Sequence, residues 1–183
     1  MVTRMTPQKG FDLVQCVLDE LMDSEDMAFV LLGTGNAEYE DFMRSAEWRH
    51  KGRLCAYIGY DEALSHRVYA GSDFLLMPSS FEPCGLSQMI AMRYGTLPIV
   101  RETGGLRDSV QPYNRFTGEG TGFSFANFNA YELADTIRRA LALYHDDHDA
   151  YCRVQRQAMS QDFSFTRSAE DYAHLYLLLL PED

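Results

Sequence analysis

Short apolar runs alternate with helix-length amphipathic segments along most of this 183-residue chain, and this alternation limits the fold more than any other feature. Strand-length apolar runs occupy residues 28–32, 54–58, 73–77 and 97–100. Segments with apolar residues three or four positions apart lie around them, at 10–23, 36–50, 62–71 and 86–95. Strands that alternate with helices at this spacing predict an α/β fold with a parallel, doubly wound sheet.

The C-terminal third reads as helices alone. Asn129, with Glu132 three residues later, predicts a capping box at the start of a helix. Two further helices fit residues 148–161 and 167–180. At the other end, Met1–Thr3 resembles the end of a strand, so we expect one domain over residues 1–183 whose first strand is truncated.

Charge and composition exclude several classes of function. The formal net charge of −11 opposes binding to nucleic acid or to an anionic membrane. The longest uncharged apolar run, residues 175–180, is too short to cross a bilayer, and the first residues lack the apolar stretch of a signal peptide. We therefore expect a cytoplasmic protein. Its four cysteines form no Cys-x-x-Cys pair, so we expect reduced thiols and no structural zinc.

Three loops between expected strands and helices carry unusual residues. In the first loop, residues 4–10, Arg4 and Lys9 stand beside a helix N-terminus, whose free N–H groups favour an anion. By itself this loop could equally hold two ordinary surface cations.

The second loop, residues 79–87, follows a strand and precedes a helix. Gly85 lets the backbone approach a ligand, Ser87 offers a hydroxyl and an N–H, and the Glu82 carboxylate suits sugar hydroxyls. The third loop, residues 101–108, contains Gly104 and Gly105, which allow backbone contact with phosphate but also mark tight turns. Each loop alone could be an ordinary turn.

The carboxyl ends of parallel strands meet at one edge of a doubly wound sheet, where ligands bind. We therefore expect Arg4 and Lys9 to converge with Glu82 and Gly85 on one pocket, although about 80 positions separate the two loops.

Three segments together resemble a known family: TRMTPQKGFDLV, GYDEALSHRVYAGSDFLLMPSSFEPCGLSQMIAMRYGTLPIVRETGGLRDSV and QRQAMSQDFSF. They are similar, in the same order, to the C-terminal domain of bacterial glycogen synthases and plant starch synthases. The resemblance implies a GT-B glycosyltransferase with two Rossmann-like domains around a cleft. This chain would be the nucleotide-sugar-binding domain of a retaining enzyme that transfers glucose from ADP-glucose to the non-reducing end of an α-1,4-glucan. No metal or other cofactor is implied.

The resemblance also assigns roles to individual residues. Arg4 and Lys9 would hold the donor diphosphate, Glu82 would contact the glucose hydroxyls, and these three are the candidate catalytic residues. Tyr60 would stack on adenine. The remaining candidates for nucleotide-sugar binding are Cys84, Gly85, Leu86, Ser87, Thr103, Gly104 and Gly105.

There are departures from the family pattern. Ile90 stands where many retaining GT-B enzymes carry a second glutamate, and Ser87 stands where threonine is frequent. The N-terminal acceptor domain is absent, so we expect this chain alone to be inactive, with that domain, ADP-glucose and the glucan as its partners. Two alternatives stay open: a stand-alone nucleotide-binding or regulatory module, and another GT-B transferase that uses UDP-glucose.

Overall fold

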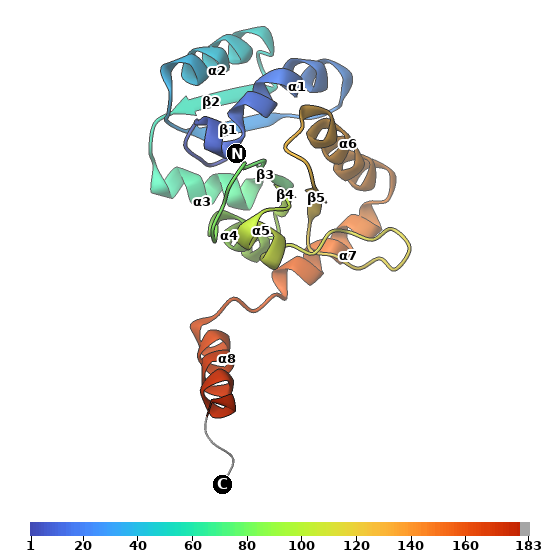
Figure 1. Ribbon diagram of the computed structural model, residues 1–183. Coiled ribbons are helices and arrows are strands. Elements are labelled where there is room, and N and C mark those ends of the chain that lie inside the picture. The colour runs from blue at the N-terminus through green and yellow to red at the C-terminus, as the bar shows by residue number, and fades with distance from the viewer. Residues whose placement is uncertain (180–183) are drawn as a thin grey trace.

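The computed structural model describes residues 1–179 of the chain. Helices and strands alternate up to β5 and are followed by three helices (Figure 1). The elements are η1 (Pro7–Lys9, a 3₁₀ turn), α1 (Phe11–Ser24), β1 (Phe29–Gly33), α2 (Ala37–Arg49), β2 (Leu54–Ile58), α3 (Glu62–Gly71), β3 (Phe74–Met77), α4 (Ser87–Tyr94), β4 (Leu97–Arg101), α5 (Gly104–Ser109), β5 (Phe123–Phe125), α6 (Ala130–Asp146), α7 (His148–Met159) and α8 (Phe165–Leu178).

All ladders between these strands are parallel, as the alternation predicts. β1 pairs with β2, while β4 lies between β3 and β5. The first residues extend beside β1, where Val2 forms a parallel bridge with Leu32 and Met5 forms one with Gly35. Consequently the loop after residue 3 and the loop after β3 emerge at the carboxyl edge of the strands.

A cavity of about 500 Å³, lined mainly by apolar residues, borders both groups of strands, with Phe29 of β1 and Phe74 of β3 in its wall. Met1 also lines it, and the Met1 ammonium group donates to the Val30 carbonyl over 2.6 Å. Burial disfavours the charged form and lowers the pKa of this amino group to about 5.

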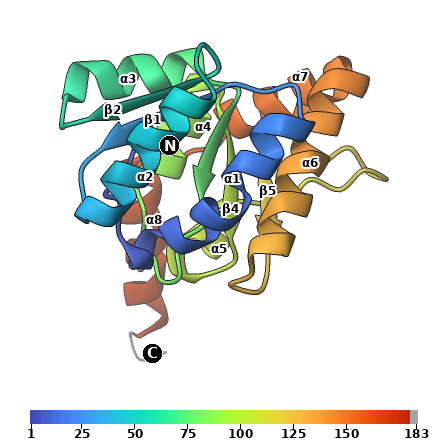
Figure 2. The same ribbon diagram turned by 90° about the horizontal axis from the view of Figure 1, so that it is seen from above.

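The helices bury their apolar faces on the strands and on one another. α2 packs on β2, α4 on β3 and β4, and α6 on β4 and β5. α1 and α6 lie side by side (Figures 1 and 2). Arg138 of α6 holds this pair together, because its guanidinium lies 2.6 Å from Glu20 of α1 and 2.9 Å from Glu25, the C-cap residue of α1.

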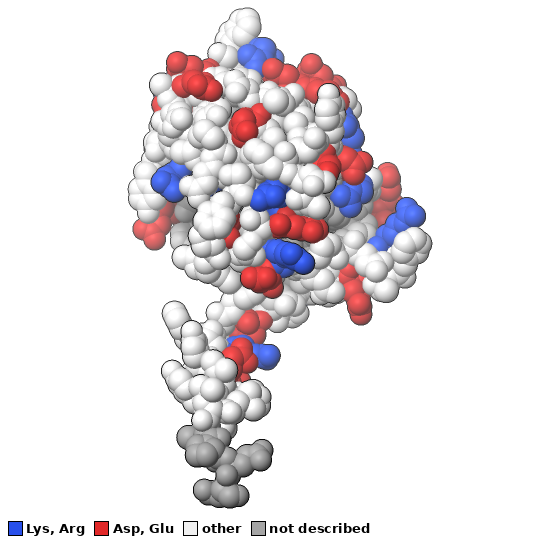
Figure 3. Space-filling view, viewed as in Figure 1, with Lys and Arg blue, Asp and Glu red and all other residues white. Residues whose placement is uncertain are grey.

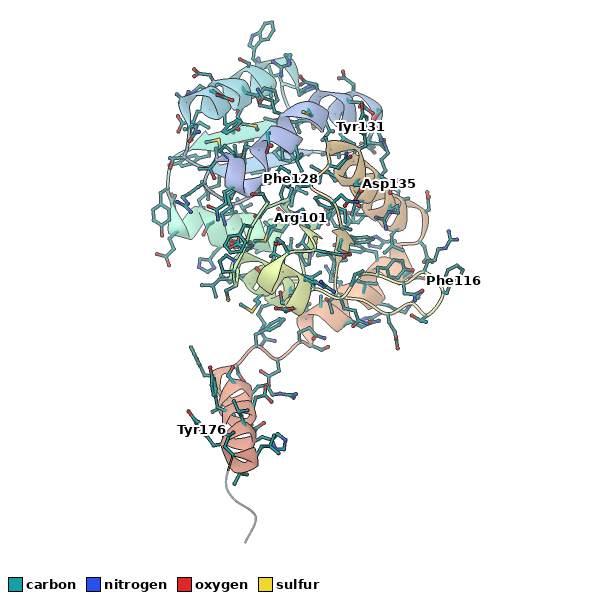
Figure 4. The ribbon with its side chains drawn as sticks, viewed as in Figure 1. Arg101, Phe116, Phe128, Tyr131, Asp135 and Tyr176 are labelled. Atoms are coloured by element: carbon teal, nitrogen blue, oxygen red, sulfur yellow. The ribbon has the colours of Figure 1, made fainter. Side chains whose placement is uncertain are left out.

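α8 projects away from the rest of the structure, and its apolar side chains, including Tyr172 and Tyr176, are exposed (Figures 1 and 4). Within residues 1–179, the structure contains no helix that is both long and apolar enough to cross a membrane. On the face shown in Figure 3, basic and acidic side chains are interspersed.

The helices and strands expected from residue 10 onwards are present within the described residues, although boundaries differ by a few positions. The expected end of a first strand at Met1–Thr3 forms only an isolated bridge, from Val2 to Leu32. The predicted last helix runs from Phe165 to Leu178, and its expected final residue, 180, lies outside the described residues. Three short elements were not predicted: the 3₁₀ turn η1, the helix α5, which begins at the paired glycines, and the three-residue strand β5.

The predicted capping box at the start of α6 is confirmed for Asn129 and wrong for Glu132. The Asn129 side chain accepts from the N–H groups of Tyr131 and Glu132, as expected for an N-cap. The Glu132 carboxylate, however, accepts from the backbone and side-chain amides of Asn127. The carboxylate reaches back past the N-cap because the side chain of Asn127 offers it a second donor.

Gly10 allows α1 to begin against the end of β3. Its φ is +75°, and a Cβ there would lie 2.2 Å from the Pro78 carbonyl oxygen. Gly118 has nearly the same φ, +74°, but within the described part of the chain nothing lies within 4 Å of its Cβ position. Comparing alanine substitutions at the two positions therefore separates the cost of the left-handed backbone from the cost of a steric clash.

We expect Gly118→Ala to lower the free energy of unfolding by about 1–2 kcal/mol, the cost of the left-handed conformation. Gly10→Ala should lose about 2–5 kcal/mol, because overpacking against Pro78 adds to that cost. Urea denaturation of both variants measures the difference. Equal losses would contradict the close contact between Gly10 and Pro78.

Candidate functional site

The loop before α1 and the loop after β3 are joined directly. The backbone N–H of Ser80 donates to the Gln8 carbonyl over 2.9 Å, and the Ser80 hydroxyl donates to the same carbonyl over 3.2 Å. The Gln8 side-chain amide donates to the Phe81 carbonyl over 3.2 Å. These contacts confirm that residues more than 70 positions apart meet at the carboxyl edge.

A cavity of about 290 Å³ opens where the two loops meet. It gathers five of the eleven residues singled out from the sequence. Its lining is Met1, Val2, Thr3, Lys9, Leu76, Met77, Ser79, Glu82, Gly85, Leu86 and Ser87. The volume is at the small end of the range for ligand pockets, about 300–1,000 Å³.

Lys9 and Glu82 form an ion pair in the wall of this cavity. Their side chains are 17% and 11% exposed, so both charges are largely removed from water. The Ser79 hydroxyl donates to the same Glu82 carboxylate over 3.4 Å. A cation and an anion whose free faces border one cavity can receive a ligand that carries both negative charge and hydroxyl groups.

The start of α4 forms another part of the wall. Its N-cap residue, Leu86, supplies no side-chain hydrogen bond to the first N–H groups. Tyr69 donates to the Ser87 hydroxyl over 3.1 Å and so orients it, and burial raises the pKa of Tyr69. The first turn of α4 therefore presents backbone donors and the positive end of the helix dipole to the cavity.

Gly104 and Gly105 lie against the loop that carries Glu82. A Cβ on Gly104 would lie 2.2 Å from the Glu82 carbonyl oxygen, and one on Gly105 would lie 2.0 Å from that of Cys84. The Gly105 N–H donates to the carbonyls of Glu82 and Pro83, over 3.1 and 3.2 Å. Close packing of the backbone thus explains why glycine stands at both positions. The Gly105 N–H already has acceptors within the protein.

Arg4, Tyr60, Cys84 and Thr103 are not among the residues that line the cavity in the described structure. Arg4 and Cys84 are exposed on the two joined loops, while Tyr60 is 86% exposed two residues after β2. Thr103 is the N-cap of α5. These residues share the carboxyl edge of the strands with the cavity, but the structure does not bring them into its wall.

Two residues without an assigned role support the site. Gln88 is fully buried, and its side-chain amide donates to the carbonyls of Cys84 and Gly85 and to the Ser109 hydroxyl. Arg101 donates to the carbonyls of Ser79 and Ser80. A charged residue at the end of an apolar strand was the available signal for Arg101, whereas nothing in the local sequence distinguishes Gln88 from a helix-surface residue.

Comparison with known proteins gives a consistent result. Residues 1–157 match the family described as Glycosyl transferases group 1. The chain is 54% identical over 183 residues to the glycogen synthase of Geobacillus thermodenitrificans (strain NG80-2), covering 100% of this chain and 37% of that protein. It is 52% identical over 180 residues to the glycogen synthase of Bacillus cereus (strain Q1), covering 98% of this chain and again 37% of the relative.

Among solved structures, the catalytic domain of starch synthase IV from Arabidopsis thaliana, bound to ADP and acarbose, matches with a TM-score of 0.85 and 37% identity. The match covers 96% of this chain and 37% of that one. The C-terminal domain of a group 1 glycosyl transferase from Francisella tularensis shares the fold, with a TM-score of 0.65 at 16% identity, over 86% of this chain and 80% of that domain. The chain therefore belongs to the group 1 glycosyl transferase family and has the α/β fold of GT-B enzymes.

Proposed function

We propose that this chain is the donor-binding domain of a retaining glucosyltransferase, which moves glucose from ADP-glucose to the non-reducing end of an α-1,4-glucan. The observation that carries the proposal is the convergence of Lys9, Glu82 and the first turn of α4 on one cavity. Similarity to glycogen synthases and to an ADP-bound starch synthase supports the choice of glucan and of adenine nucleotide.

In this proposal the charges of the site match those of the reaction. The nucleoside diphosphate gains negative charge as the bond between glucose and phosphate breaks. The Lys9 ammonium group and the N–H groups that begin α4 stabilise that charge, which is electrostatic catalysis by groups already in place. Glu82 accepts from glucose hydroxyls, and the Tyr69-bound Ser87 hydroxyl assists at the phosphates. Arg4 approaches the diphosphate from the exposed side of its loop.

Lys9 has two partners in this scheme. Without a ligand it pairs with Glu82, and the donor must bring its diphosphate to Lys9 while its sugar meets the carboxylate. A ligand that offers both groups gains more than one that offers phosphate alone, because each buried charge keeps a partner. The site thus favours a nucleotide sugar over inorganic phosphate.

The chain spans about 37% of the length of the glycogen synthases that it matches. Glucan transfer requires donor and acceptor to be held together, so we expect transfer to need the remaining part of the relatives' length. A stand-alone nucleotide-binding module is the second candidate. It predicts ADP binding by this chain but no transfer when the chain is joined to that remaining part.

Calorimetric titration of the chain with ADP and UDP tests the choice of base. We expect ADP to bind more tightly, because the Tyr60 ring is exposed and free to stack on adenine. Tyr60→Ala should weaken ADP binding by about 5-fold to 150-fold, equivalent to stacking worth roughly 1–3 kcal/mol. Tyr131→Ala is the matched control, since that ring is similarly exposed, at 82%, on α6.

Equal affinity for the two nucleotides would count against an adenine-specific donor. An unchanged ADP affinity in Tyr60→Ala would remove Tyr60 from the site.

A further inference from the structure

Arg101 connects three loops at the carboxyl edge of the strands. It is the last residue of β4, and its Nε donates to the Ser79 carbonyl over 2.9 Å, while Nη2 donates to the Ser80 carbonyl. On its other side, Nη1 donates to the Ala126 carbonyl over 3.4 Å, and the guanidinium carbon lies 5.8 Å from the Phe128 ring centre. Figure 4 shows Arg101 and Phe128 close together in the middle of the structure.

The chemistry of arginine suits this position. Its planar guanidinium offers five N–H donors in a fixed fork, so one side chain can bind carbonyls from two loops and stack on an aromatic ring. Within residues 1–179 no carboxylate lies within 4.0 Å of Arg101 to form an ion pair. The contacts of its guanidinium are therefore with backbone carbonyls and a ring, and two of those carbonyls belong to the loop that carries Glu82.

These contacts are linked to the Glu82 carboxylate through Ser79. Arg101 holds the Ser79 backbone, and the Ser79 hydroxyl donates to Glu82. At the far side of the same loop, the Gly105 N–H donates to the Glu82 carbonyl. We call Arg101 and Gly105 the β4–α5 clamp, because they hold the loop of residues 79–84 before and after Glu82.

Arg101 does not itself reach the cavity among the described residues, whereas Ser79 and Glu82 both line it. The 79–84 loop is therefore the route by which Arg101 would affect a ligand in this cavity. This separates Arg101 from Lys9, whose side chain borders the cavity.

We propose that Arg101 is a positioning residue, which holds the 79–84 loop so that the Glu82 carboxylate faces the sugar-binding side of the cavity. The inference rests on the proposed function for the identity of the ligand. Its physical content is that the clamp fixes the sugar-facing carboxylate and leaves the diphosphate contacts of Lys9 and α4 largely unchanged.

The first test uses the 183-residue chain and amide hydrogen exchange. In Arg101→Gln we expect several-fold faster exchange at the Ser80 and Gly105 amides, which hydrogen-bond within and beside the loop. Arg107→Gln, an exposed arginine on α5, is the matched control and should leave both amides unchanged. Unchanged exchange in Arg101→Gln would overturn the inference, whatever the activity of the protein.

The second test uses a hybrid enzyme in which this chain replaces the matching segment of the Geobacillus thermodenitrificans glycogen synthase. We expect Arg101→Gln to lower kcat by about 10-fold to 100-fold, because a small misplacement of a substrate-positioning group costs up to that much. Inhibition by ADP should stay within about twofold, since ADP lacks the glucose that Glu82 contacts. Arg101→Lys should not restore kcat, because a compact ammonium group lacks the planar fork of donors that binds the carbonyls of two loops at once.

Two results of the second test would overturn the inference. Equal losses of kcat and of ADP affinity would mean that Arg101 contacts the nucleotide or only stabilises the fold. Full activity in Arg101→Lys would mean that charge alone matters. An inactive hybrid with Arg101 intact would instead count against the proposed function, and the exchange comparison would still decide the role of Arg101 in holding the loop.

Discussion

Replacing Lys9 with alanine in the hybrid enzyme is expected to lower kcat/KM for ADP-glucose by about 10²–10³-fold. This is the usual cost of removing one preorganised group that stabilises transition-state charge, about 2.7–4 kcal/mol. Lys9 is placed for that role because its ammonium group borders the cavity beside the first turn of α4. Initial rates of glucan elongation over a range of ADP-glucose concentrations measure the effect.

Lys51 provides the control, since Lys51→Ala makes the same change in net charge. It is exposed in the turn between α2 and β2, at the amino end of β2, on the opposite edge of the strands from the cavity. We expect its kcat/KM to stay within about twofold of the unsubstituted hybrid, as for other surface substitutions away from a site. If both lysine variants lose activity equally, overall charge explains the loss and Lys9 has no special role.

The second large effect concerns stability. Lys9→Met should lower the free energy of unfolding by about 3 kcal/mol, because it leaves the Glu82 carboxylate buried without its cation. For a chain of this length that loss corresponds to a fall in melting temperature of about 6–12 °C. Glu82→Gln should cost less, since the long Lys9 side chain can carry its charge towards water.

The double variant Lys9→Met with Glu82→Gln distinguishes the interaction between the two side chains from the contacts that each makes with the rest of the protein. Replacing both charges removes the uncompensated partner, so we expect most of the stability lost in Lys9→Met to return. Thermal and urea denaturation of the four proteins complete the cycle. If the losses of the single variants simply add, the two side chains do not interact in solution and the ion pair is not part of the resting site.

The order of helices and strands was predictable from the sequence, because apolar periodicity is a local property. Runs such as residues 28–32 and the helical spacing of Phe11, Val14 and Leu18 report which side of each element is buried. β5 and α5 were missed because three and six residues are too few to show a period. The second half of the predicted capping box failed because Glu132 meets a better donor pair at Asn127.

The sequence by itself also determined that the loops of Lys9 and Glu82 share one edge, since parallel strands leave their carboxyl ends on the same side. Only the tertiary structure decided which contacts the loops make at that edge. Lys9 pairs with Glu82, 73 positions away in the sequence, and the Gly105 N–H donates to carbonyls of the loop that carries Glu82. Arg101 joins carbonyls of two other loops. Such contacts depend on distances between loops that a linear pattern does not encode, because their geometry is set by how β3, β4 and α5 pack together.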